Sequence, residues 1–103
     1  MNPQIPQLTP ADAADRTEAV LLDVREAGEL ADGRIAGSTH IPLGQLATRV
    51  FELDRSRPVI TVCRSGGRSS QAAQFLAAQG YDVANLAGGM TAWVGEGRPV
   101  TTR

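Results

Sequence analysis

Lysine is absent from this 103-residue chain, and cysteine and histidine each occur once. All ten basic residues are therefore arginine, which excludes Schiff-base chemistry on a lysine side chain. The single cysteine excludes an internal disulfide, a Cys-x-x-Cys redox pair and a multi-cysteine metal site, and the single histidine excludes a multi-histidine metal site. We therefore expect neither a metal nor a cofactor.

The chain also lacks a strong excess of either charge and any long apolar run. Its net charge is -1 and 42% of its residues are hydrophobic, so we expect no nucleic-acid partner. No apolar stretch near Met1 has the form of a signal peptide, and none is long enough to cross a bilayer. We therefore expect no membrane contact and a cytoplasmic protein with a reduced thiol.

The length of the chain fits one domain, residues 1–103, with flexible ends at 1–7 and 98–103, where prolines stand among polar residues. Between the ends, patterns typical of strands alternate with patterns typical of helices. This alternation predicts an α/β fold with a mainly parallel sheet and helices on both faces. Strands are expected at 5–8, 19–25, 38–42, 59–62 and 81–86, and helices at 10–16, 26–32, 43–53, 69–79 and 90–94.

The most informative stretch runs from residue 58 to residue 79. Residues 59–62 are all β-branched, as in a parallel strand buried on both faces. Cys63 follows at the carboxyl end of this strand, and a helical pattern begins after a short loop. In open α/β sheets, this is the edge at which ligands bind.

The loop after Cys63 favours a thiolate and an incoming anion. Gly66 and Gly67 would let its successive amides curl into an anion-binding nest, and Arg64 and Arg68 add positive charge. The alternative is that Cys63 is only a small buried residue that ends a strand. That alternative does not explain two glycines and two arginines immediately afterwards.

Three further side chains are possible supporting residues of the site, and two of them, Asp23 and Arg25, are expected near the same edge of the sheet. Asp23 and Arg25 end the strand at 19–25. We expect Asp23 to cap a turn or pair with an arginine; a functional role would consist in positioning a loop arginine rather than acting as a general base. His40 is expected to be half-buried and hydrogen-bonded to backbone, the alternative being a titrating role near the loop.

Four motifs, taken together, resemble the rhodanese homology domain, in that family's order and roughly its spacing over residues 8–99. The resemblance implies a five-stranded, mainly parallel sheet and a sulfurtransferase activity. The motifs are Leu21-Leu22-Asp23-Val24-Arg25-Glu26, Gly33-x-Ile35-x-Gly37-x-x-His40-Ile41-Pro42, Cys63-Arg64-Ser65-Gly66 and Leu86-x-Gly88-Gly89-Met90-x-x-Trp93.

The resemblance also implies a mechanism. The cysteine at the position of Cys63 would attack the outer sulfur of thiosulfate, carry that sulfur as a persulfide and deliver it to cyanide or a thiol. Arg64 and Arg68 would attract the anionic donor, and the loop amides would hold the charged sulfur. The substrate-binding residues implied are Arg64, Ser65, Gly66, Gly67, Arg68 and Ser69.

Two alternatives and one departure bear on this interpretation. Phosphatases and arsenate reductases of the same fold have a longer loop with arginine six positions after the cysteine, where this chain has Ser69. A sulfur-relay module that receives its persulfide from a protein donor remains open, while the intact Cys63 argues against a non-catalytic module. Arg34 stands where the family usually has histidine, and we expect activity to survive this difference.

Overall fold

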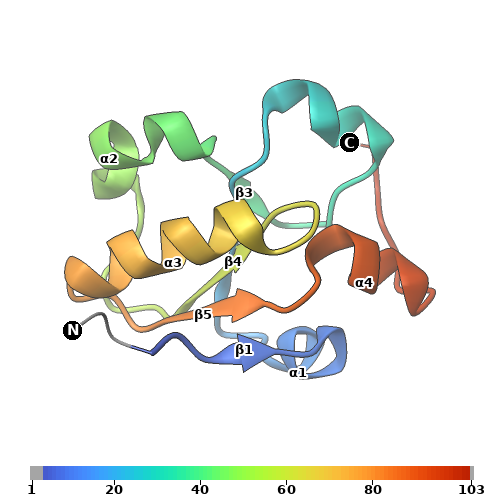
Figure 1. Cartoon of the computed structure of the whole chain (residues 1–103), viewed down its shortest axis with the longest axis horizontal. Coiled ribbons are helices and arrows are strands. Elements are labelled where there is room, and N and C mark those ends of the chain that lie inside the picture. The colour runs from blue at the N-terminus through green and yellow to red at the C-terminus, as the bar shows by residue number, and fades with distance from the viewer. Residues whose placement is uncertain (1–3, 103) are drawn as a thin grey trace.

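Five short strands form a single sheet in the computed structural model, which describes residues 4–102. The order of the strands is β1-β5-β4-β2-β3, and all four neighbouring pairs are parallel, so the expected sheet is confirmed (Figure 1). The strands are β1 (Gln7–Leu8), β2 (Val20–Asp23), β3 (Thr39–His40), β4 (Val59–Val62) and β5 (Val83–Leu86). Because every pair is parallel, the carboxyl ends of the strands lie at one edge.

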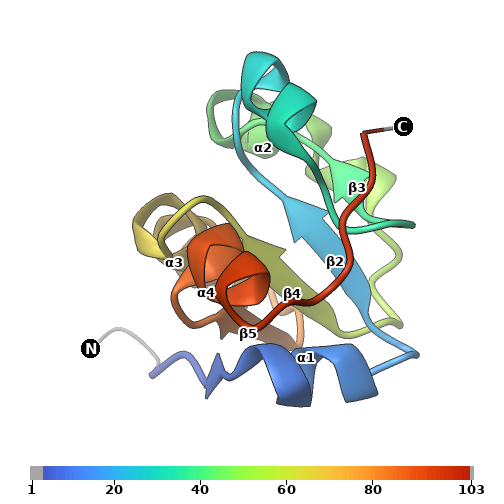
Figure 2. The ribbon, with the colours of Figure 1, turned by 90° about the vertical axis from the view of Figure 1, so that its right-hand side faces the viewer.

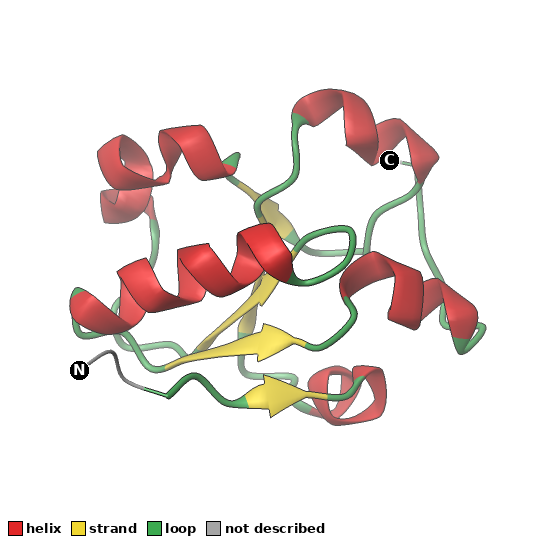
Figure 3. Cartoon of the chain, in the orientation of Figure 1, coloured by secondary structure: helices red, strands yellow, loops and turns green. Residues whose placement is uncertain are grey.

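Helices cover both faces of this sheet, as expected (Figure 3). The helices are α1 (Pro10–Asp15), α2 (Leu46–Arg49), α3 (Gly67–Ala78) and α4 (Gly89–Gly95), with 3-10 turns η1 (Ala27–Asp32), η2 (Leu43–Gln45) and η3 (Val50–Glu52). No helix among residues 4–102 is long and apolar enough to span a bilayer.

Two apolar clusters pack against opposite faces of the sheet. One unites α2 and α3 with Leu22 and Val59, and the other unites α1 and α4 with Ile60 and Val62. Val59 faces one cluster, and Ile60 and Val62 face the other, so β4 is buried on both faces and its sequence does not alternate between apolar and exposed polar residues. Cys63 belongs to the cluster beneath α3.

The prediction of a single amphipathic helix over residues 43–53 is wrong in one respect. The structure divides this segment into η2, α2 and η3, so only four residues have α-helical hydrogen bonding. Gly44, Thr48 and Val50 have low helix propensity, and tighter 3-10 turns are frequent in such short segments. The apolar side chains still reach the core, since Leu46 and Leu53 are buried.

Both ends of the described chain make specific contacts. The backbone amide of Asn85 donates to the carbonyl of Pro6 at 2.9 Å. At the other end, Thr101 pairs with Arg34 in an antiparallel bridge, and the Trp93 indole donates to the carbonyl of Pro99 at 2.9 Å. Figure 2 shows this C-terminal segment running from α4 toward the region before β3. These contacts join Pro6, Pro99 and Thr101 to the rest of the domain, and the flexibility expected at 1–7 and 98–103 stays a prediction. Residues 1–3 and 103 of these ends lie outside the described residues.

Candidate active site

The residues after Cys63 turn back around its sulfur. The Gly66 amide donates a hydrogen bond to Sγ at 3.0 Å, and the Ser69 hydroxyl donates one at 3.3 Å. Gly66 makes this turn with φ of 108°, a backbone conformation that a side chain would strain. Gly67, in contrast, is the first residue of α3 and has no positive φ. The sulfur therefore lies beneath a ring of donors formed by the loop and the first turn of α3.

Two opposed effects act on the pKa of the Cys63 thiol. The residue is only 1% exposed, and this burial raises the pKa. Hydrogen bonds from the Ser69 hydroxyl and from the amides of Ser69, Gly66 and Ser65 outweigh the burial and lower the pKa below its usual value. Cys63 is thus a buried core residue whose lowered pKa increases its share of thiolate, the nucleophilic form of cysteine.

Replacing Ser69 by alanine is expected to raise the pKa of Cys63, because the hydroxyl stabilises the thiolate and not the thiol. The pH dependence of Cys63 alkylation by iodoacetamide measures this pKa: the midpoint should move to higher pH, with less thiolate at neutral pH. Ser56→Ala, in an exposed turn, is the control; an unmoved midpoint in Ser69→Ala would contradict the assignment.

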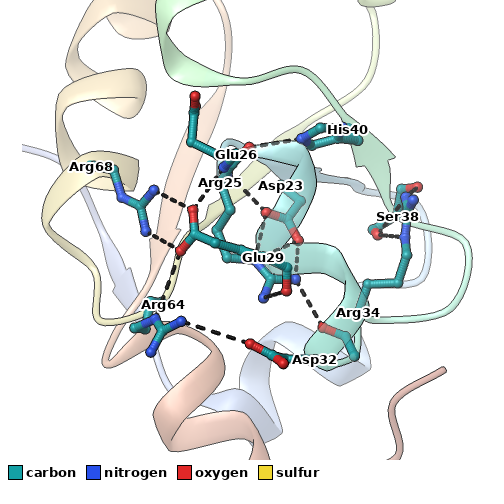
Figure 4. A network of polar contacts seen from close by, with 11 residues as sticks. Asp23, Arg25, Glu26, Glu29, Asp32, Arg34, Ser38, His40, Arg64 and Arg68 are labelled. Atoms are coloured by element: carbon teal, nitrogen blue, oxygen red, sulfur yellow. Dashed lines mark hydrogen bonds and ion pairs between the residues drawn. The ribbon is translucent and has the colours of Figure 1, made fainter. Parts of the chain in front are cut away.

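The two loop arginines contact a carboxylate that we did not predict. Arg68 binds Glu29 of η1 with both terminal guanidinium nitrogens, at 2.7 and 2.8 Å, and Arg64 approaches the same carboxylate at 3.7 Å (Figure 4). Arg64 also lies 3.9 Å from Asp32. The hydrogen bond from Arg68 is the main reason that the pKa of Glu29 falls to about 2. Glu29 is therefore charged throughout the physiological range.

Asp23, Arg25 and His40 lie at the same edge but brace η1 rather than the sulfur. Arg25 is buried and pairs with Asp23 at 2.8 Å, as expected for a structural aspartate. Arg25 also donates to the carbonyls of Glu29 and Gly33, at 3.3 and 3.0 Å. His40 is half-buried, and its Nε2 lies 2.7 Å from the carbonyl of Arg25, as expected for a residue bonded to backbone. These three side chains thus hold the segment that carries Glu29.

The base of the loop is held by the start of α4. The amide of Met90 donates to the carbonyl of Cys63 at 2.8 Å, and the amide of Thr91 donates to the carbonyl of Arg64 at 3.0 Å. This close approach places Gly89 directly against the loop backbone. The pair Gly88-Gly89 was a motif in the sequence, but its contact with the loop was not predicted.

A cleft of about 360 Å³ opens beside Arg64, on the side of the loop that faces α4. It is lined by Arg25, Asp32, Gly33, Arg64, Met90, Thr91, Val94 and Gly95. Arg64 is the one loop residue in this lining, so the cleft borders the loop at Arg64 and includes neither Cys63 nor Arg68. Within residues 4–102, no group of three or more histidine, cysteine, aspartate or glutamate side chains is placed to hold a metal ion.

Known proteins resemble this chain both in sequence and in fold. The family profile described as Rhodanese-like domain matches residues 9–96. A protein of Allochromatium vinosum named sulfurtransferase is 40% identical over 88 residues, which cover 84% of this chain and 82% of that protein. The thiosulfate sulfurtransferase GlpE of Shewanella oneidensis is 34% identical over 91 residues, which cover 87% and 85%. The crystal structure of a rhodanese-related protein from Thermoplasma volcanium matches with a TM-score of 0.92 at 33% identity, covering 95% of this chain and 99% of that one.

Proposed function

Because this chain belongs to the rhodanese-like domain family, we propose that it is a sulfurtransferase that moves a sulfane sulfur from thiosulfate or a similar donor to a thiophilic acceptor through a persulfide on Cys63. The observation that carries the proposal is the pair of donors on Sγ, the Gly66 amide and the Ser69 hydroxyl. A core cysteine needs no such donors. The names of two relatives, sulfurtransferase and thiosulfate sulfurtransferase, support the same reaction class.

The reaction consists of two displacements at sulfur. The Cys63 thiolate attacks the outer sulfur of thiosulfate, so that a new S–S bond forms, the S–S bond of the donor breaks, and sulfite leaves with the electron pair. Cyanide or a thiolate then attacks the outer sulfur of the persulfide and restores the Cys63 thiolate. No general base is assigned to either step, because the hydrogen bonds that lower the pKa of Cys63 favour the thiolate as the attacking form. This agrees with Asp23 and His40 being engaged in holding η1.

Different loop residues would bind the charged sulfur and the anionic donor. The amides of Ser65, Gly66 and Ser69 stabilise negative charge on the sulfur, first in the thiolate and then in the persulfide. Gly67 opens α3 without a side chain beside the loop, and Arg64 and Arg68 would attract the anionic donor. The short loop, with Arg68 five positions after Cys63, favours this reaction over phosphate-ester or arsenate chemistry.

Intact-mass measurement after incubation with thiosulfate tests the proposal. We expect the protein to gain the mass of one sulfur atom and to lose it on addition of cyanide, with thiocyanate released. One site is expected because the chain has one cysteine. A protein that never gains the sulfur while its thiol stays free to alkylation would contradict turnover from thiosulfate. Gain only from a persulfide-bearing protein would identify the relay alternative, with a sulfur-relay protein as the partner.

A further inference from the structure

The guanidinium group of Arg68 is already occupied in the free protein. Both of its terminal nitrogens donate to Glu29, one to each carboxylate oxygen. A planar two-point contact of this kind is also how a guanidinium binds an oxyanion such as a sulfonate group. A donor anion and Glu29 therefore compete for the same two nitrogens.

The charges around the loop also cancel. Arg64 and Arg68 contribute two positive charges, and Glu29 and the Cys63 thiolate contribute two negative charges, so the sum is zero. Asp32 adds a further negative charge at the exposed edge, 3.9 Å from Arg64. A small dianion consequently meets much less attraction than the two arginines alone would provide.

Glu29 is fixed in this position by contacts other than those to the loop arginines, Arg64 and Arg68. Its side chain accepts a hydrogen bond from the amide of Glu26 at 2.8 Å, and its carbonyl accepts one from the buried Arg25. Only about a fifth of the Glu29 side chain is exposed, compared with 62% for Arg64. The carboxylate is thus a built part of the site rather than a mobile surface charge.

We propose that Glu29 is a specificity-determining residue, which neutralises the loop arginines and so disfavours dianionic sulfur donors relative to donors of lower charge. This inference rests on the proposed sulfur transfer and names the class of donor the site prefers. Donors that present the outer sulfur with one negative charge or none, such as a thiosulfonate or an uncharged persulfide group, are the better substrates.

Glu29→Gln tests the proposal, because glutamine removes the charge but keeps an oxygen that can accept from the Glu26 amide. Thiosulfate, a dianion, is compared at low ionic strength with methanethiosulfonate, a monoanion that transfers its outer sulfur and releases a sulfinate. Since Coulomb energy is proportional to charge, we expect kcat/KM to rise about threefold for the monoanion and about tenfold for the dianion. Glu52→Gln is the matched control, since it also removes an arginine-paired surface carboxylate.

A second measurement does not depend on sulfur transfer. Cys63 is the only thiol, so its alkylation by iodoacetate and by iodoacetamide compares an anionic with a neutral reagent at the same sulfur. Both reagents transfer a carbon to Sγ and release iodide, and their rate ratio cancels any change in thiolate fraction. We expect Glu29→Gln to raise the ratio of iodoacetate to iodoacetamide about threefold.

The outcomes separate the two proposals. If wild-type protein accepts sulfur from neither donor, turnover from small donors is wrong, while the alkylation ratio still decides the role of Glu29. If the alkylation ratio falls or stays unchanged in folded Glu29→Gln, Glu29 does not select donors by their charge. Asp32→Asn is the second variant, at a residue whose side chain is 78% exposed. It should also raise the ratio of iodoacetate to iodoacetamide alkylation, by less than Glu29→Gln does. A fall in this ratio would count against the proposal.

Discussion

Replacing Cys63 by serine should reduce sulfur transfer by more than about a thousandfold, because a hydroxyl stays protonated at neutral pH and cannot carry a sulfane sulfur as a stable persulfide. The serine hydroxyl can still accept from the Gly66 amide and replaces a side chain of similar size. The free energy of unfolding should therefore change by only about 1 kcal/mol. Thiocyanate formation and intact mass measure activity, and urea unfolding measures stability.

Ser69→Ala is the matched comparison for this experiment. It leaves the sulfur in place and removes one donor to it, so activity should fall only part of the way. Turnover that persists in Cys63→Ser would show that the sulfur of Cys63 is not the carrier. A loss of activity accompanied by unfolding would be uninformative for catalysis, which is why the urea titration accompanies every assay.

Gly89→Ala should have the largest effect on stability, at least about 3 kcal/mol in the free energy of unfolding. Gly89 has φ of 57°, and a Cβ there would lie 2.3 Å from the carbonyl oxygen of Cys63 and 2.7 Å from the backbone of Arg64. Neither neighbour is a flexible side chain that can turn away. The start of α4 must therefore move from the loop, which weakens the hydrogen bonds from Met90 and Thr91 to the loop carbonyls.

Gly95→Ala provides the control at the other end of the same helix. Nothing lies within 4 Å of a Cβ at Gly95, and alanine has higher helix propensity than glycine, so this variant should be as stable as the wild type or slightly more stable. Because the loop carbonyls belong to Cys63 and Arg64, Gly89→Ala should also slow alkylation of Cys63. Equal stability of the two variants would mean that α4 does not pack on the loop as described.

Much of the site could be predicted because its parts are adjacent in the chain. The run from Val59 to Val62 indicated a buried strand, and the cysteine, glycines and hydroxyl residues that follow belong to the loop and the first turn of α3. Gly66 and Ser69 follow Cys63 by only three and six positions, so a tight turn after the strand is sufficient to bring both to its sulfur. The roles of these residues in sulfur transfer stay predictions until the variants are measured.

Glu29 shows where local sequence was insufficient. It lies 39 positions before Arg68, in a segment with weak helical pattern, and it has the sequence appearance of an ordinary surface acid. Its importance comes from the parallel pairing of β2 with β4, which brings the segment after β2 beside the loop after β4. The contact of α4 with the loop has the same origin, since β5 pairs with β4 on the other side.

The sequence alone thus determined the strands, the place of Cys63 at the end of β4 and the loop that follows it, because each depends on residues within a few positions of one another. Tertiary structure alone decided the charge that the loop presents to a donor. That charge depends on Glu29 and Asp32, which meet the loop arginines only through strand order, and electrostatic attraction acts across space irrespective of distance along the chain.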